Sequence, residues 1–217
     1  MILRRRSLSF WLALGLAWLL LPGNALDSQR LLQSAQQMGP NAAFRMQALI
    51  EEMRGEVGAD EQRKIKTIND FFNLQILFRP DIDNWGMVDY WSSPMELLNK
   101  GAGDCEDYAI AKYFSLIAMG VSPAKMRMVY VRAQLGGSVQ AHMVLAYYPD
   151  PAAEPLILDN LITDLRPASR RPDLAPVFSF NAEGLWQGVG SASAGDPTAR
   201  LSRWREVLSK AKSEGWW

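Results

Sequence analysis

Apolar residues follow helical spacing through the first third of the chain. Residues 27–58 carry an apolar stripe that Pro40 interrupts, and a second stripe follows Asp60, a residue type that caps helix N-termini. The first stripe contains Leu49, Ile50, Met53 and Val57, and the second follows positions that recur at helical spacing, namely Ile65, Ile68, Phe71, Phe72, Gln75 and Ile76. Intervals of three and four residues predict helices with one buried face, so both segments should lie against a common core.

The middle of the chain changes to a short helix, a glycine-rich loop and a long apolar run. The capping-box pattern at residues 93–96 predicts a helix over residues 94–100. Residues 109–119 are almost entirely apolar and are followed by Gly120, which is typical of a helix buried on nearly all sides. Residues 78–91 break the helical pattern with aromatics and acids, so we interpret them as a loop.

Beyond residue 125 the pattern changes to short runs that are typical of strands. The runs cover residues 126–132, 141–148, 156–159 and 177–180. Turns at residues 136–137 and 149–151 make an antiparallel meander the economical topology for the first three runs. The small residues 191–195 indicate a hinge, and Asp196 can cap a final helix that either packs on the core or binds a partner. The expected fold class is α+β.

The first 25 residues are typical of an export signal. Three arginines at residues 4–6 precede an apolar stretch at residues 8–21, and residues 23–25 offer a small-residue cleavage site. We therefore divide the chain into a signal peptide, residues 1–25, and a single domain, residues 26–217. An uncleaved membrane anchor is the alternative, but the apolar stretch is short for a span and a proline ends it. We expect a mature chain that does not span the membrane and lies outside the cytoplasm.

Charge and composition narrow the function classes. Removal of the signal takes away three arginines and no acid, so a formally neutral chain becomes mildly acidic. Its one remaining basic cluster is Arg170-Arg171, so we set nucleic-acid binding aside. The 48% hydrophobic content and eight tryptophans suffice for one sizeable core. The single cysteine rules out an intramolecular disulfide, and an unpaired thiol in an oxidising compartment indicates that it is needed or well buried.

That cysteine, Cys105, lies where the glycine-rich loop meets the long apolar helix. Unpaired backbone N–H groups and the helix dipole favour a thiolate there, whereas the neighbouring acids Asp104, Glu106 and Asp107 oppose one. A lone cysteine is usually a small buried hydrophobe. The charged neighbours argue against that simple interpretation.

The single histidine, His142, lies near the start of a predicted strand, and Asp159 ends the next one. A thiolate, an imidazole that moves its proton and a carboxylate that orients the ring are the groups that nucleophilic acyl transfer requires. Although a lone histidine is more often structural, we identify Cys105, His142 and Asp159 as the candidate catalytic residues.

Four segments together resemble a known family, the LapG-type bacterial transglutaminase-like cysteine proteases. The motifs are Asp89-Tyr-Trp91, Gly103-Asp-Cys105-Glu-Asp107-Tyr-Ala-Ile-Ala-Lys-Tyr-Phe114, Ala141-His142-Met-Val-Leu145 and Leu158-Asp159-Asn-Leu161. The resemblance covers most of the mature chain. Four separated motifs in the right order are far more specific than any one of them.

The resemblance implies a periplasmic cysteine endopeptidase with a papain-like and transglutaminase-like core. In this core the catalytic cysteine begins a central helix that packs on an antiparallel sheet carrying the histidine and the aspartate. The resemblance also implies that the enzyme cleaves the N-terminal region of a large surface adhesin at a dialanine-type site, which releases the adhesin and disperses biofilm. It further implies calcium as cofactor and control by an inner-membrane cyclic-di-GMP receptor, which binds the enzyme through its periplasmic domain.

The residues beside Cys105 give separate support for calcium. Asp104, Glu106 and Asp107 offer three hard oxygen ligands in four positions, and carbonyls and water would have to complete the coordination. No cluster of histidines and cysteines in the sequence indicates zinc. The alternative is that these acids cap the helix and face solvent.

Two other functions remain open at this point. A transglutaminase or amidase would use the same three catalytic residues, because an acyl-enzyme can pass its acyl group to an amine as well as to water. A non-catalytic periplasmic binding module that has kept the fold is the other alternative. It would predict a damaged triad, and all three residues are present.

Overall fold

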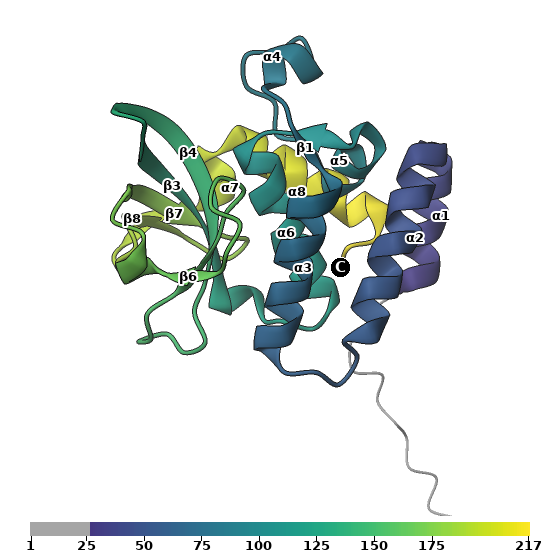
Figure 1. Ribbon diagram of the computed structural model, residues 1–217, viewed down its shortest axis with the longest axis horizontal. Coiled ribbons are helices and arrows are strands. Elements are labelled where there is room, and N and C mark those ends of the chain that lie inside the picture. Colours follow the sequence, from purple (N-terminus) through teal and green to yellow (C-terminus); the bar gives the residue numbers. More distant parts are fainter. Residues whose placement is uncertain (1–26) are drawn as a thin grey trace, which may run out of the picture.

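The computed structural model describes residues 27–217, so the expected signal peptide and its cleavage site lie outside the described residues. Helices gather on one side of a curved antiparallel sheet, as the α+β prediction required (Figure 1). None of the helices within residues 27–217 is long and apolar enough to cross a membrane.

Three helices form the N-terminal part of the helical side. They are α1 (Ser28–Met38), α2 (Pro40–Gly55) and α3 (Glu61–Gln75). As predicted, Pro40 begins a new helix and the Asp60 carboxylate caps α3, accepting the Arg63 backbone N–H at 2.9 Å. Val57 lies beyond the end of α2 and is 80% exposed, so the predicted apolar stripe stops at Met53.

The segment before the cysteine contains one more helix than the sequence predicted. The elements are β1 (Leu77–Phe78), α4 (Asp81–Asn84), α5 (Pro94–Lys100), β2 (Ala102–Gly103) and α6 (Cys105–Ala118). The capping box at the start of α5 is formed, and Gly101 ends that helix with a left-handed φ of 69°. Strands β1 and β2 pair in parallel, which ties the segment carrying α4 to the loop that leads into α6.

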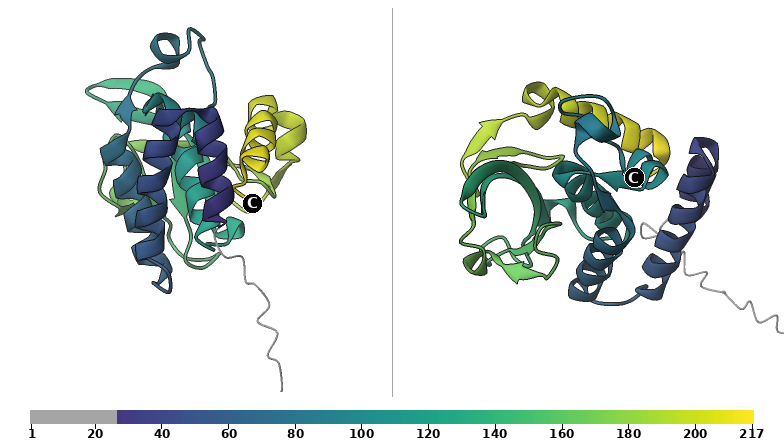
Figure 2. Two further views of the ribbon diagram at one scale, coloured as in Figure 1. Left: turned by 90° about the vertical axis from the view of Figure 1, so that its right-hand side faces the viewer. Right: turned by 45° about the horizontal axis from the view of Figure 1, so that its top comes forward.

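The sheet curves away from the helices into an open half-barrel (Figure 2). Its strands are β3 (Met126–Leu135), β4 (Ser138–Tyr147), β5 (Leu156–Leu158), β6 (Arg166–Pro167), β7 (Leu174–Phe180), β8 (Leu185–Gln187) and β9 (Ser193–Gly195). Short 3-10 turns, η1 (Pro123–Lys125) and η2 (Ala168–Arg170), precede β3 and β7. The order β6-β5-β4-β3-β7-β8-β9 confirms the predicted meander for β3, β4 and β5, which continues into β6, whereas β7 pairs with the other edge of β3. Strand β9 occupies the segment interpreted as a hinge.

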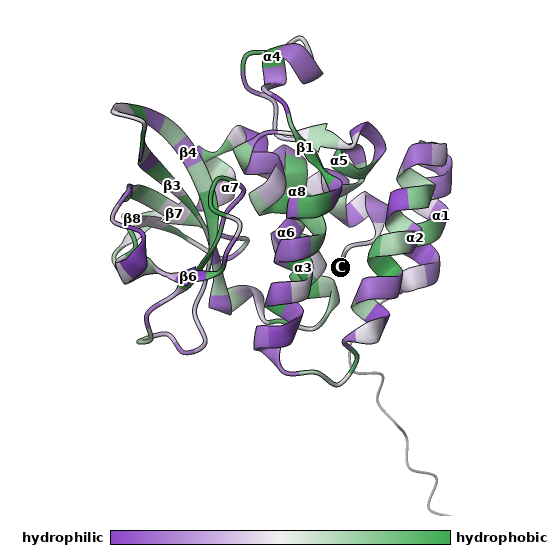
Figure 3. Cartoon of the chain, viewed as in Figure 1, coloured by the Kyte–Doolittle hydropathy of each residue, from purple (hydrophilic) through white to green (hydrophobic). Residues whose placement is uncertain are grey.

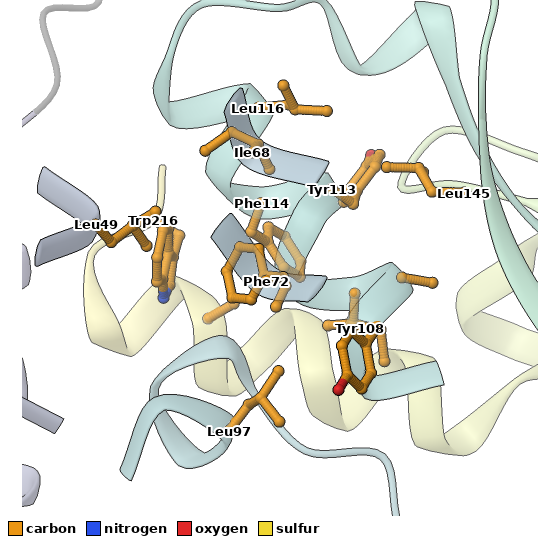
Figure 4. Close-up of a cluster of buried hydrophobic side chains, with 14 of the residues drawn as sticks. Leu49, Ile68, Phe72, Leu97, Tyr108, Tyr113, Phe114, Leu116, Leu145 and Trp216 are labelled. Carbon is orange, nitrogen blue, oxygen red and sulfur yellow. The ribbon is translucent and has the colours of Figure 1, made fainter. Parts of the chain in front are cut away.

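The core lies between α6 and the sheet. Along β4, Met143, Leu145 and Tyr147 face the helices, whereas Val144 and Ala146 join a smaller cluster on the opposite face. Figure 4 shows Tyr113 and Phe114 of α6 among side chains from α3, α5 and β4. Hydrophobic residues concentrate in this middle region, and hydrophilic ones are frequent along the outer helices α1 and α2 (Figure 3). Helix α6 is therefore buried on nearly all sides, as its sequence predicted.

The C-terminal segment docks on this core. It contains α7 (Pro197–Arg200) and α8 (Ser202–Glu214), and Asp196 caps the short α7 instead of the longer helix. Trp204 of α8 is fully buried against the aromatic side chains of α6. At its far end, the Glu214 carboxylate accepts hydrogen bonds from the Ser93 hydroxyl and the Met95 backbone N–H, at the start of α5. Of the two roles left open for this helix, the structure supports packing on the core.

Candidate active site

Cys105 is the first residue of α6, so its side chain lies at the helix N-terminus as predicted. The loop before the helix passes so close to Asp107 that residue 103 has no room for a side chain. A Cβ on Gly103 would lie 2.5 Å from an Asp107 carboxylate oxygen. The thiol contacts β4 through a hydrogen bond from the Met143 backbone, and its Sγ lies 2.9 Å from Glu106 Oε2. The N-terminus of α6 thus presents the thiol beside the strand that carries His142.

The surroundings of the thiol oppose its ionisation. Burial raises the pKa of Cys105 well above its ordinary value, and the negative charges of Glu106 and Asp104 raise it further. The Met143 hydrogen bond acts in the opposite direction but does not compensate. With this set of charges alone, the thiol keeps its proton at neutral pH.

His142 and Asp159 form a buried pair where β4 extends past the end of β5. The antiparallel pairing of Leu145 with Leu158 brings β4 beside β5, and Asp159 is the residue directly after β5. His142 Nε2 lies 2.8 Å from Asp159 Oδ1, and the two residues are 3% and 2% exposed. Burial alone would raise the pKa of Asp159, but His142, the Leu161 backbone N–H and a nearby arginine lower it to about 2. Asp159 is therefore a stable carboxylate partner for the imidazole.

The structure brings two of the three candidate catalytic side chains into direct contact and places the third, Cys105, against the residue next to His142. Within the described residues, the Cys105 thiol makes no hydrogen bond to the His142 ring, and its partner on β4 is the neighbouring residue Met143. Catalytic hydrogen bonds are often loose before substrate binds. Because Nε2 faces Asp159, Nδ1 is the ring atom left to exchange a proton with the thiol.

A buried lysine that the sequence analysis did not single out supports the segment around Asp159. Lys112 lies on α6, fully buried, and burial lowers its pKa to about 7. Its Nζ donates to the Asn69 and Asn73 side-chain oxygens at 2.9 Å and to the Asp159 backbone carbonyl at 3.1 Å. A lysine inside an apolar helix pattern was the available signal, since such a residue needs partners when buried.

The acids beside Cys105 belong to a larger cluster than the sequence indicated. Carboxylate oxygens of Asp81, Asp104 and Asp107 lie within 4.8 Å of one another, and the same holds for Asp81, Asp89 and Glu106. Asp104, Glu106 and Asp107 were predicted as metal ligands, whereas Asp81 from α4 and Asp89 from the following loop were not. The only signal for these two was the unusual acidity of residues 78–91.

The electrostatics of this acidic cluster fit a bound hard cation. Burial, reinforced by neighbouring carboxylates, raises the pKa of Asp104 to about 6, of Asp107 to about 8 and of Glu106 to about 9. The Oδ1 atoms of Asp81 and Asp104 are buried and have no hydrogen-bond partner among the described residues. Buried carboxylate oxygens normally find a donor or a cation. An all-oxygen set of this kind suits calcium or magnesium better than zinc.

Asp107 is the least free member of the cluster. Its Oδ1 accepts the Ser92 backbone N–H at 2.8 Å, and its Oδ2 faces the Asp104 backbone N–H at 3.4 Å. The latter contact is half of a capping box at the start of α6. Part of the helix-capping alternative therefore holds for Asp107, although this residue is buried and does not face solvent.

A family model and several solved structures match this chain. The family model for the bacterial transglutaminase-like cysteine proteinase, BTLCP, matches residues 46–173. The solved structure of Legionella pneumophila LapG is 37% identical, with a TM-score of 0.73, and the match covers 86% of this chain and 98% of that chain. An EGTA-treated form of the same protein is 37% identical over the same shares, with a TM-score of 0.75. The calcium-bound form gives 36% identity and a TM-score of 0.71, with 84% of this chain and 98% of that chain covered. A search of curated proteins returned no match.

Proposed function

This chain belongs to the family of bacterial transglutaminase-like cysteine proteinases, and from that premise we propose that it is a calcium-dependent periplasmic endopeptidase. Its proposed substrate is the N-terminal region of a large surface adhesin, cleaved at a dialanine-type site. Cleavage would release the adhesin and promote biofilm dispersal. An inner-membrane cyclic-di-GMP receptor would bind the enzyme through a periplasmic domain and so control its cleavage of the adhesin.

The observation that carries the catalytic part of this proposal is the His142–Asp159 pair beside the N-terminus of α6. His142 Nδ1 takes the proton of the Cys105 thiol, and the thiolate attacks the carbonyl carbon of the scissile peptide bond. The C–N bond then breaks as the imidazolium gives its proton to the leaving amine. His142 then removes a proton from a water molecule, which attacks the thioester and releases the thiol. Throughout, Asp159 holds the ring through Nε2 and stabilises its charged form.

The N-terminus of α6 supports the charged intermediate. The Cys105 backbone N–H belongs to the first turn of the helix, where the dipole and the unpaired donors favour negative charge on a tetrahedral oxyanion. A second donor to the oxyanion does not come from the indole of the loop before α5. The Trp91 Nε1–H instead donates to Asp89 Oδ1 at 3.0 Å, so it is already engaged.

Calcium at the acidic cluster would counter the charge that opposes thiolate formation. The proposed ligands are Asp104, Glu106 and Asp107, to which the geometry adds Asp81 and Asp89. A divalent cation there would supply positive charge beside Cys105, offsetting the carboxylates that raise the pKa of the thiol. The calcium-bound form of Legionella pneumophila LapG supports this assignment.

We expect Asp81→Asn to weaken calcium binding on the order of tenfold or more. The substitution removes one negative charge from the cluster and keeps the side-chain shape. Isothermal titration calorimetry of chelator-treated protein measures the effect. Asp83→Asn is the matched control, because Asp83 lies on the same helix, is exposed and belongs to neither acidic group. Equal affinity in the two variants would remove Asp81 from the site, and no binding by wild type would overturn the calcium proposal.

The proposed function is tested with the purified N-terminal segment of a large adhesin from the same bacterium. Alkylation provides a clean control, since iodoacetamide can modify only one cysteine in this chain. We expect one discrete cleavage, given by untreated enzyme with calcium and absent after alkylation or chelation. Intact substrate with folded, calcium-loaded enzyme would contradict the protease assignment, and incorporation of a fluorescent amine would then favour a transglutaminase.

A further inference from the structure

Arg171 carries a buried positive charge and has no role in the mechanism proposed above. In the sequence it is one half of a basic pair, but the two neighbours differ in the structure, because Arg170 is exposed and Arg171 is 2% exposed. It follows η2 and lies behind the catalytic pair. A buried arginine is costly unless its charge is matched, so its partners indicate its role.

Two carboxylates share the Arg171 guanidinium. Its Nη2 lies 2.6 Å from Asp159 Oδ2 and 2.8 Å from Asp173 Oδ2, and its Nε lies 3.0 Å from Asp173 Oδ1. The side chain of Asp173 is 24% exposed, whereas that of Asp159 is fully buried. Asp173 thus holds the guanidinium from the solvent side while Nη2 points to the catalytic aspartate.

The contacts of Asp159 divide cleanly between its two oxygens. Oδ1 accepts His142 Nε2–H at 2.8 Å and the backbone N–H groups of Asn160 and Leu161 at 2.7 and 3.1 Å. Among the described residues, the hydrogen-bond partner of Oδ2 is Arg171. Lys112 holds the backbone carbonyl of Asp159 and does not touch its carboxylate. Arg171 therefore holds the second oxygen of the carboxylate and, together with the backbone N–H groups on Oδ1, opposes rotation about the Cβ–Cγ bond.

We propose that Arg171 is a positioning residue that fixes the Asp159 carboxylate so that Oδ1 receives the His142 Nε2–H and Nδ1 stays free for the thiol. The inference rests on the proposed function of His142 as the catalytic base. Its consequence is that Arg171 controls the tautomer of the ring without touching substrate. Lysine cannot fully replace it, because only the planar guanidinium reaches two carboxylates with fixed, forked donors.

The tautomer can be read directly, since His142 is the single histidine of the chain. Long-range ¹H–¹⁵N NMR on protein without a histidine tag, at a pH where the ring is neutral, should show the Nε2–H form in wild type. Arg171→Met should give a mixture of the two tautomers, and Arg171→Lys should lie between them. Arg166→Met is the matched control, because Arg166 is a half-exposed arginine of the preceding segment whose ion pair is with Asp164.

Kinetics on the cleavage substrate give the second readout. We expect kcat to fall by about 10- to 100-fold in Arg171→Met with KM nearly unchanged, and Arg171→Lys to recover part of the loss. In a double-mutant cycle, Asp159→Asn with Arg171→Met should be no slower than Asp159→Asn alone, because Arg171 acts through Asp159. A merely structural role would instead leave the tautomer unchanged and add its cost in both backgrounds.

The two proposals fail in different ways. An unchanged tautomer and kcat in folded Arg171 variants would overturn the positioning role and leave the protease assignment standing. An enzyme with no proteolytic activity would overturn the proposed function, while the NMR signal would still test the Arg171 contact. If Arg171→Met does not fold, Arg171→Lys, which keeps the charge, carries both measurements, and a wild-type tautomer with wild-type kcat would overturn the proposal.

Discussion

Replacement of Cys105 by alanine is expected to abolish peptide-bond cleavage and to leave the fold intact. The substitution removes the chain's one thiol, and with it the nucleophile on which the acyl-enzyme depends. In enzymes that act through a nucleophile and a base, loss of either lowers kcat on the order of a million-fold, to the level that binding and the oxyanion site alone provide. Cys105 is half-buried at a helix terminus, so truncation to alanine leaves no large cavity. Initial cleavage rates and thermal melts of wild type and variant measure both parts.

A matched control for Cys105→Ala is Ser115→Ala. Ser115 lies on α6 and is fully buried, and its hydroxyl has no hydrogen-bond partner among the described residues. Its replacement should leave cleavage at the wild-type rate. Wild-type cleavage by Cys105→Ala would show that the nucleophile lies elsewhere.

Asp159→Asn is expected to lower kcat by about 10⁴-fold while KM changes little. In the serine-protease triad the equivalent change has an effect of that size, because the amide favours the wrong tautomer of the histidine and no longer stabilises the imidazolium. Here the asparagine keeps the shape of the side chain, and Arg171 keeps Asp173 as a partner for its charge. Steady-state kinetics give the two constants, and circular dichroism checks the fold.

The exposed Asp164, in the loop that follows Asp159, supplies the control for that experiment. Asp164→Asn removes a carboxylate of the same type whose ion pair with Arg166 is at the surface. Its kcat should match wild type, since exposed pairs of this kind contribute little. Near-full activity in Asp159→Asn would remove Asp159 from the catalytic set and would also remove the basis for a role of Arg171.

Local sequence signals predicted the elements that position the thiol. The capping pattern at residues 93–96, Asp60 before α3 and the apolar run after Cys105 each gave a helix that the structure confirms. These features are short-range: a cap bonds within three residues, and an apolar pattern reports burial within the same helix. The contact of His142 with Asp159 was also predicted, because two neighbouring antiparallel strands place nearby positions side by side.

Contacts between distant segments could not be predicted from the sequence. Strand β7 pairs with the free edge of β3, and no local pattern specifies which edge a later strand joins. Asp81 reaches the acidic cluster because α4 folds back over the start of α6, and the sequence indicated only that the segment was unusual. In the sequence, Arg171 resembles a surface cation. In the structure, its guanidinium contacts the Asp159 carboxylate. In each case the deciding interaction joins residues whose spacing carries no periodic signal.

The bond from Ser93 to Glu214 has a consequence for the order in which the fold is completed. It closes a loop of 121 residues, and contacts of such long sequence separation form late because chain entropy must be lost first. During synthesis the nucleophile, base and carboxylate all leave the ribosome before α8 does. A growing chain therefore contains every candidate catalytic residue before it contains the helix that packs on α6. We expect the core around α6 to reach its full stability only when α8 docks, because Trp204 is fully buried against α6.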